Sequence, residues 1–251
     1  MKETIQRILP PAWGYLILQR ALEPFFDAPC LGCGQPKADP LCKECQRLLR
    51  YLPPEHCDRC QGIVRQGICP LCGQREIPFE RVLALGAYRS GLRNLLRHLK
   101  YHKRPDLGYW LGERLVPVVA PFVQPDWLVV PIPIHQKRRR ERGYNQTEPI
   151  AFHLARRLDL DYRPDLLYRR FSTQPSYQKS KKERWSQAAE VFQASDRLPA
   201  DRHVLLVDDI MTTGATAWEA AMALRRAGAR SVHLAIAARA ITACSAKVSP
   251  I

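Results

Sequence analysis

The sequence lacks the fingerprints of the commonest nucleotide-binding folds. It has no Gly-x-x-x-x-Gly-Lys-Ser/Thr loop and no Gly-x-Gly-x-x-Gly turn, which excludes a Walker A site and a dinucleotide-binding site. No Ser/His/Asp or Cys/His arrangement supports a hydrolytic nucleophile. Long apolar runs are missing too, because Pro10, Pro11 and Glu23 interrupt the N-terminal segment and no small-residue cleavage site follows. We therefore expect neither a signal peptide nor a membrane-spanning helix, and predict a short amphipathic helix at 12–26.

Unpaired cysteines are nearly absent. Eight of the nine cysteines form four Cys-x-x-Cys pairs, and the last two pairs repeat the first two at an offset of 27 residues. Each pair makes a tight turn that presents two thiolates to one metal, and two such turns supply the four sulfurs that tetrahedral zinc prefers. The spacing therefore predicts two structural Zn²⁺ sites, with the ligands Cys30, Cys33, Cys42, Cys45, Cys57, Cys60, Cys69 and Cys72.

Disulfides and redox chemistry are the rival uses of these cysteines. Disulfides need an oxidising compartment, and nothing in the sequence directs export, so we expect a cytoplasmic protein. A redox Cys-x-x-Cys would not occur four times with matched spacing. Four thiolates leave no position for water, which disfavours a catalytic zinc. The eight-residue spacer in both repeats favours pairing within each repeat over an interleaved pairing, and the sequence leaves both open.

Acidic residues are scarce. The chain has 24 Asp and Glu against 39 Lys and Arg, which gives a formal net charge of +15. Two Zn(Cys)₄ centres would reduce this charge to about +11, because each centre carries a charge of −2. So basic a chain indicates a polyanionic partner, either a pyrophosphate-bearing substrate or a nucleic acid, and charge alone does not distinguish the two.

After the cysteines, apolar strand patterns alternate with helical ones. We predict strands at 81–88 and 126–132 and helices at 92–101 and 107–120. This alternation is typical of an α/β domain with a mainly parallel sheet flanked by helices. Such a sheet binds its ligands beyond the carboxyl ends of its strands.

The most informative stretch is Val204-Leu-Leu-Val-Asp-Asp-Ile-Met-Thr-Thr-Gly-Ala-Thr216. Four apolar residues predict a buried strand with two carboxylates following its end, and a helix is expected from Ala215 to a stop at Gly228. The unpaired N–H groups of a helix N-terminus, together with Thr hydroxyls and a glycine, make an anion site.

This run resembles the phosphoribosyl pyrophosphate (PRPP) motif of type I phosphoribosyltransferases. The resemblance implies that Asp208 and Asp209 are the catalytic pair and hold the two ribose hydroxyls. It also implies a set of residues that bind the 5′-phosphate, namely Thr212, Thr213, Gly214, Ala215 and Thr216.

A second stretch, Val130-Pro-Ile-Pro-Ile-His-Gln-Lys-Arg-Arg-Arg-Glu-Arg-Gly-Tyr-Asn-Gln146, narrows the resemblance. It is similar to the Val-Pro-x-Pro … Arg-x-Arg-Gly-Phe-Asn-Gln stretch of the ComF family, which includes GntX-like proteins, and Tyr144 stands where Phe is usual. Members of this family join a cysteine-rich zinc module to a phosphoribosyltransferase-like domain. The resemblance implies an N-terminal helical segment (1–29), a double Cys₄ zinc-ribbon module (30–76) and a type I phosphoribosyltransferase-like α/β domain (77–251).

The same resemblance implies a pyrophosphate site and Mg²⁺ as the cofactor that accompanies PRPP. Asn145 and Gln146 are expected to cap a helix that begins near Thr147. A loop at 171–186 is expected to close over the site. A solvated basic surface is the alternative for 137–142. The pyrophosphate-binding candidates are Lys100, Pro131, Ile132, Pro133, His135, Lys137, Arg138, Arg140 and Arg142.

Two classes of function remain open at this point. The first is a magnesium-dependent phosphoribosyltransferase with an unassigned acceptor, which acts in DNA uptake or in nucleotide metabolism. The second is a nucleic-acid-binding protein of DNA uptake in natural competence, in which the PRPP site is regulatory or inactive. The expected partners are PRPP, single-stranded DNA or another nucleic acid, a peripheral contact with membrane-bound DNA-uptake machinery, and a second copy of the chain in a homodimer. Aromatic residues are few around the cysteines, which argues against base stacking there.

Overall fold

The structure is a computed structural model of the chain, and it describes residues 29–36, 40–50, 52, 55–64, 66–69, 72–73, 77–170 and 191–240. The helix predicted at 12–26 and the closing loop predicted at 171–186 lie outside the described residues. Among the described helices, none combines the length and the apolar character needed to cross a bilayer.

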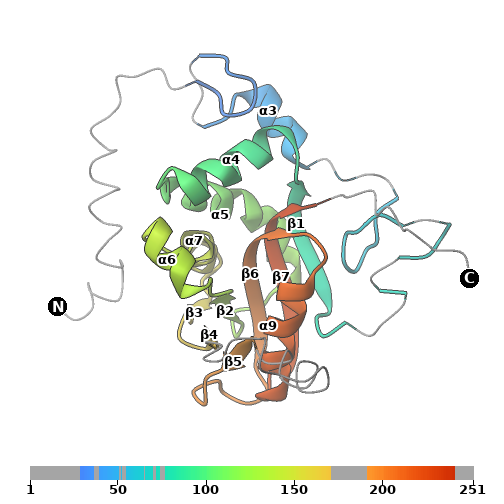
Figure 1. The fold of residues 1–251 in the computed structure, drawn as a ribbon. Helices are drawn as coiled ribbons and strands as arrows, with labels where there is room; N and C mark the ends of the chain where they lie inside the picture. The colour runs from blue at the N-terminus through green and yellow to red at the C-terminus, as the bar shows by residue number, and fades with distance from the viewer. Residues whose placement is uncertain are drawn as a thin grey trace, which may run out of the picture.

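A five-stranded sheet lies at the centre of the molecule (Figure 1). Every pairing in it is parallel, so the mainly parallel α/β sheet that the sequence predicted is confirmed. β6 and β7 share the longest ladder, and their carboxyl ends therefore lie side by side. In sheet order the strands are β1 (Arg81–Ala87), β7 (Ser231–Arg239), β6 (His203–Met211), β2 (Leu128–Pro131) and β3 (Asp161–Tyr162).

Both faces of this sheet are covered, which explains why its strands are continuous apolar runs rather than alternating ones. Leu205 and Val207 of β6 belong to the core on one face. Val204 and Leu206 belong to the core on the other. All four side chains are fully buried.

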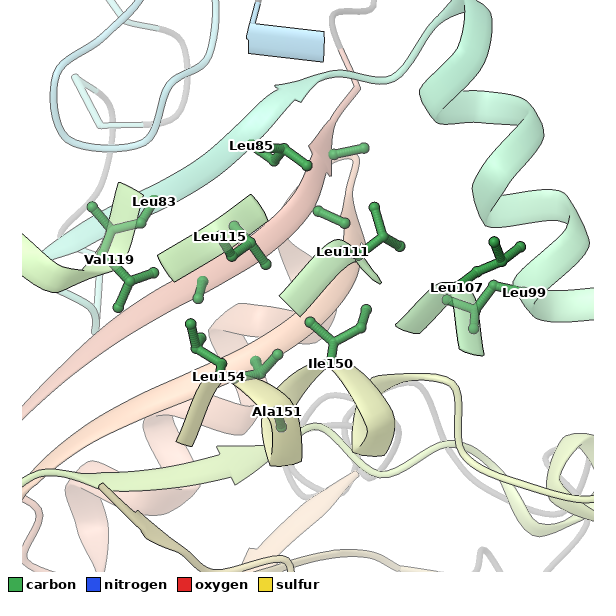
Figure 2. Packing of buried hydrophobic residues seen from close by; sticks show 14 of the residues in the cluster. Leu83, Leu85, Leu99, Leu107, Leu111, Leu115, Val119, Ile150, Ala151 and Leu154 are labelled. Carbon is green, nitrogen blue, oxygen red and sulfur yellow. The ribbon is translucent and has the colours of Figure 1, made fainter. Parts of the chain in front are cut away.

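Three helices cover the first face: α4 (Ser90–Tyr101), α5 (Asp106–Val119) and α7 (Thr147–Leu158). Figure 2 shows Leu111 and Leu115 of α5 between Ile150 and Leu154 of α7 and Leu85 of β1. Helices α4 and α5 begin and end within two residues of the positions that the sequence predicted, and α7 begins at Thr147 as expected. The 3-10 turn η2 (Ala120–Phe122) follows α5 directly.

Helix α9 (Ala215–Arg226) covers the second face together with a two-stranded antiparallel sheet, β4 (Leu167–Arg169) and β5 (Phe192–Ala194). The predicted stop of α9 is confirmed, because Gly228 follows its last turn with a φ of 96°. A short helix, α6 (Gln136–Arg142), occupies the basic run that the sequence left without an assigned structure.

The two cysteine repeats pack on opposite faces of the sheet. Cys30 and Leu41 of the first repeat join the core on the α4 side of the sheet. The short elements α3 (Lys43–Arg47) and η1 (Leu48–Arg50) follow in this repeat. In Figure 1, α3 lies above α4. Cys60 and Cys69 of the second repeat join the core on the α9 side.

The second repeat also covers the free edge of the sheet. The N–H groups of Val82 and Ala84 in β1 point away from β7. They donate to the Arg59 carbonyl at 2.7 Å and to Oε1 of Gln61 at 2.8 Å. An edge strand without such partners would leave its N–H groups open to pairing with another chain. The cysteine-rich segment is therefore an integral part of the fold.

Candidate functional site at the carboxyl edge of the sheet

The acid pair lies within β6, and this corrects the sequence prediction that it follows the strand. Parallel pairing with β7 continues through Asp208↔Ile236 and Ile210↔Ala238 to the end of the strand. The ladder holds this segment extended. The strand therefore fixes the backbone of both acids. The sequence prediction ended the strand with its four apolar residues, 204–207, and so placed the acids outside it.

Asp209 is held by a side chain from α4 and by the side chain of Gln146, which precedes α7. Asp209 is 4% exposed. Its Oδ2 lies 2.5 Å from Nζ of Lys100 on α4, and Nε2 of Gln146 donates to its Oδ1 at 3.4 Å. A buried carboxylate needs a counter-charge and hydrogen bonds, and these two residues provide both.

Asp208 is in a different environment, although it is adjacent. It is half-buried, and its Oδ1 accepts the N–H of Asp209 at 2.8 Å. Burial raises the pKa of Asp208 well above its usual value, and the nearby charge of Asp209 raises it further. The pair thus combines one carboxylate neutralised by a lysine with one carboxyl group that resists ionisation in the unliganded protein.

The phosphate-binding candidates form the turn from β6 into α9. Gly214 occupies the N-cap of α9 with a φ of 83°, a left-handed conformation that explains why glycine is needed there. Oγ1 of Thr213 accepts the N–H of Ala215 at 3.4 Å. Thr212 and Thr216 are exposed. The first N–H groups of α9 have no carbonyl within the helix to donate to, so the turn presents donors to an anion.

The pyrophosphate candidates on β2 are positioned by the residues that follow α6. Pro131 and Ile132 are buried. The carbonyl of Ile132 accepts Nδ2 of Asn145 at 3.1 Å and Oγ1 of Thr147 at 2.9 Å. These bonds tie the end of β2 to the start of α7. Pro133 follows, half-buried.

His135 has a local structural contact. Its Nδ1 accepts the N–H of Lys137 at 3.1 Å, so this side chain caps α6. That contact accounts for one ring nitrogen and orients the imidazole at the start of the helix.

A basic cavity of about 350 Å³ lies beside the acid pair. Three pyrophosphate candidates, Lys100, Arg138 and Arg142, are brought together in its wall. Lys137 and Arg140 are exposed on α6 and do not line it. The complete lining is Lys100, Tyr101, Lys103, Arg138, Glu141 and Arg142.

Gln146 and Tyr144 contribute in ways that the sequence analysis missed. Asn145 caps α7 as predicted, since its Oδ1 accepts the N–H of Thr147 at 3.3 Å. Gln146 does not cap the helix with its side chain. Its amide instead accepts Nη1 of Arg142 at 2.8 Å and donates to Asp209. The hydroxyl of Tyr144 donates to the carbonyl beside Lys100, that of Leu99. The signal for these roles in the sequence was the hydroxyl of Tyr144 and the amide of Gln146 directly after the basic run 137–142.

The eight cysteines form two groups, one in each repeat, and in each group the four Sγ atoms lie within 4.8 Å of one another. The Sγ atoms of Cys57 and Cys72 are 3.8 Å apart, and those of Cys60 and Cys69 are 3.4 Å apart. Sulfurs around a zinc ion with Zn–S bonds of about 2.3 Å are about 3.8 Å apart, so the geometry fits Zn²⁺. The N–H of Cys42 donates to the Cys30 thiol at 3.2 Å, a contact that favours a thiolate.

Comparisons with known proteins agree with this architecture. Residues 145–247 match the family described as "Phosphoribosyl transferase domain". Competence protein ComFC of Bacillus subtilis (strain 168) is 34% identical over 207 residues, which cover 72% of this chain and 83% of that protein. The chain belongs to the ComF family. Its phosphoribosyltransferase-like fold, preceded by two Cys₄ groups, is the one that the sequence predicted.

Two further relatives align with this ComF-family chain over most of their own length. Competence protein F of Haemophilus influenzae is 25% identical over 234 residues, which cover 86% of this chain and 99% of that protein. The DNA utilization protein YhgH of Escherichia coli (strain K12) is 28% identical over 172 residues, which cover 66% of this chain and 75% of that protein.

Metal analysis of the purified protein should give two zinc ions per chain. Cys33→Ser and Cys57→Ser should each reduce the content to about one, because each repeat closes its own site. Removing both metals with a chelator should unfold the segment, since structural zinc contributes on the order of 10 kcal/mol to folding. Loss of both ions from a single substitution would contradict the pairing within repeats.

Asp208→Asn should stabilise the unliganded protein at neutral pH. A carboxyl group with a raised pKa favours the folded state only while it is protonated, and this contribution is lost as the pH rises from the usual value of 3.8 towards the raised value. The gain from the amide should therefore be small near pH 4 and grow towards pH 7. We expect a higher Tm than that of the wild-type protein at pH 7, and a smaller difference near pH 4.

The control for this measurement is Asp196→Asn, the same charge change on an exposed side chain. It should leave Tm at pH 7 nearly unchanged. A lower Tm for Asp208→Asn at pH 7 than for the wild-type protein would show that the structure stabilises the ionised carboxylate.

Proposed function

We propose that this ComF-family protein binds PRPP together with Mg²⁺ at the carboxyl edge of its sheet. One arrangement carries the proposal: the acid pair Asp208 and Asp209 precedes a helix N-terminus that suits a phosphate, and Lys100, which pairs with Asp209, also lines a predominantly basic cavity. PRPP has a matching sequence of groups, with a 5′-phosphate at one end, two ribose hydroxyls, and a pyrophosphate at the other end.

The 5′-phosphate would bind the loop from Thr212 to Thr216. Gly214 allows the turn, and the first N–H groups of α9 point along the helix axis towards the anion, where the helix dipole favours negative charge. The exposed hydroxyls of Thr212, Thr213 and Thr216 add donors at the surface of the loop. A site of this kind needs no cationic side chain.

The ribose hydroxyls would donate to the acid pair. Asp209 is already oriented by Lys100 and Gln146, so it would accept hydrogen bonds with little loss of side-chain entropy. Asp208 has the carboxyl group with the raised pKa, and hydroxyl donors or a cation would favour its ionised form. Ligand binding and the charge of Asp208 are thereby coupled.

The pyrophosphate would lie in the basic cavity. Lys100 is the link between the two halves of the site, because its ammonium pairs with Asp209 and also lines this cavity. Arg138 and Arg142 approach from α6. In a transfer reaction pyrophosphate leaves the anomeric carbon, and these cations would stabilise the charge that develops on it.

The acid pair also fits Mg²⁺, which prefers hard oxygen ligands from one or two carboxylates together with substrate oxygens. Asp208 is half-buried and has no cationic partner at hydrogen-bond distance among the described residues, so its carboxylate would hold the ion. The ion would supply neutralisation of the pyrophosphate charge. We place this chemistry in the cytoplasm, where the thiols of Cys₄ sites stay reduced.

A second candidate function, binding of single-stranded DNA, has one specific observation in its favour. Tyr101 is 68% exposed at the rim of the basic cavity, and the guanidinium of Arg142 lies 5.3 Å from the centre of its ring. An exposed aromatic ring among cations suits base stacking next to a phosphate backbone. The relatives named for competence and DNA utilization point in the same direction. Both ligands could use this surface.

Isothermal titration calorimetry with PRPP and Mg²⁺ tests the proposal. The wild-type protein should bind, and Asp209→Asn should weaken binding by about 10- to 100-fold, because hydrogen bonds to a charged group contribute about 1.5–3 kcal/mol. Lys100→Met should weaken it similarly. Arg140→Gln is the matched control, since this exposed cation lies on α6 outside the cavity, and its Kd should change by less than about threefold.

Absence of heat from the wild-type protein at millimolar PRPP would reject the proposal. In that case salt-dependent binding of single-stranded DNA that weakens in Tyr101→Ala would support the second candidate function in its place.

A further inference from the structure

Arg239 is a buried arginine that the PRPP site described above does not use. It is the last residue of β7, it pairs in register with Met211 at the end of β6, and it is 6% exposed. An arginine is rarely buried to this extent unless its charge and its five N–H groups find partners. Its partners come from two parts of the molecule.

One side of the guanidinium holds the start of the phosphate loop. Nη1 of Arg239 donates to the carbonyl of Met211 at 2.9 Å and to the carbonyl of Thr212. It also donates to the carbonyl of Ala240 at 3.3 Å. Met211 is the last residue of β6, and Thr212 is the first residue of the loop that leads to α9.

These bonds orient the donors of the loop. The C=O and N–H groups of one planar trans peptide point in opposite directions. Arg239 draws the carbonyls of Met211 and Thr212 towards itself, so the N–H groups of Thr212 and Thr213 are turned the other way. Those N–H groups belong to the loop that we assign to the phosphate.

The other side of the guanidinium contacts the second cysteine repeat. Nε of Arg239 donates to the carbonyl of Cys60 at 3.2 Å, and Cys60 is fully buried. The space is tight, because a Cβ at Gly62 would lie 3.1 Å from Nη2 of Arg239 and 3.4 Å from Sγ of Cys60. One side chain thus joins a metal-ligand turn to the phosphate loop.

The same repeat supplies the counter-charge of Arg239. The Cys60 thiol lies next to this guanidinium, because a Cβ at Gly62 would contact both groups. A loaded Zn(Cys)₄ centre carries a net charge of −2, which suits a neighbouring buried cation.

The first cysteine repeat has no such connection to the loop in the described part of the chain. Its polar contacts run to the helices on the opposite face. Asn94 on α4 donates to the Leu31 carbonyl at 2.8 Å, and Arg114 on α5 donates to Gln46 at 3.2 Å. The protein therefore contains one cysteine cluster that is linked to the loop 212–216. The other cluster lacks this link among the described residues and can serve as the control.

We propose that Arg239 is a positioning residue for the phosphate loop 212–216, and that metal loading of the second cluster (Cys57, Cys60, Cys69, Cys72) sets how tightly the loop binds the phosphate of a phosphorylated ribose. The ligand part of this inference rests on the proposed function, whereas the link between the cluster and the loop does not. Loss of this metal, or oxidation of its thiolate ligands, would remove the counter-charge, release Arg239 and loosen the loop.

Hydrogen exchange of the amides at 211–216 and calorimetry with ribose 5-phosphate test the role of Arg239 in the full-length protein. Arg239→Gln should speed exchange in the loop and weaken ribose 5-phosphate binding by at least about tenfold, with two zinc ions still bound. Arg239→Lys should recover part of both losses, because it restores the charge. The matched control is Arg59→Gln: Arg59 donates to the carbonyls of Ile77 and Phe79 and does not contact the loop.

The cluster is tested by comparing Cys57→Ser with Cys33→Ser, each of which should lose one zinc ion. Cys57→Ser should speed exchange in the loop and weaken binding more than Cys33→Ser does. If Cys57→Ser does not fold, Gly62→Ala is the substitute. It keeps all four cysteines and shifts the guanidinium by a few tenths of an ångström, so it should speed exchange in the loop by less than Arg239→Gln does.

Equal effects of the two cysteine variants, or unchanged exchange in Arg239→Gln, would overturn the inference. If the wild-type protein does not bind ribose 5-phosphate, the phosphate assignment fails. The exchange measurements would still decide whether Arg239 links the cluster to the loop.

Discussion

The parallel ladder between β6 and β7 is the constraint on which the other features of the site depend. It runs from His203↔Ser231 to Met211↔Arg239, so that the acid pair, the start of the loop 212–216 and a buried guanidinium are held side by side at the carboxyl edge of the sheet. Strands of this kind are stable only when both faces are covered. The helices α5, α7 and α9 and both cysteine repeats provide that cover. The geometry of the site therefore depends on the packing of these elements against the sheet.

The ion pair of Lys100 with Asp209 is the second constraint on the site, because it places a counter-charge at one carboxyl group of the acid pair and not at the other. A buried carboxylate beside a half-buried lysine is a weak contribution to stability, because desolvation offsets much of the attraction. Its effect here is positional: the lysine faces both the acid pair and the basic cavity. Asp208 is adjacent but lacks such a cation, and burial raises the pKa of its carboxyl group well above the usual value. The two carboxyl groups of the pair therefore differ in their electrostatic environment.

The sequence predicted the parallel α/β fold, the strands and helices around the site, and the grouping of the cysteines, because periodicity and spacing are local signals. It did not predict that Gln146 reaches Asp209 or that the acid pair lies inside a strand, because both depend on pairing between distant segments. Nor did it single out Arg239, which looks like any arginine after an apolar run. Its meaning comes from the carbonyls of Cys60 and Met211, which only the folded chain brings to it.

The most direct test of the account is a crystal structure of the protein with PRPP and Mg²⁺. The account predicts that the 5′-phosphate contacts the N–H groups of residues 213–216, the ribose hydroxyls contact Asp208 and Asp209, and the pyrophosphate lies near Lys100. A ligand bound elsewhere, with the loop between β6 and α9 free of phosphate, would contradict the central claim.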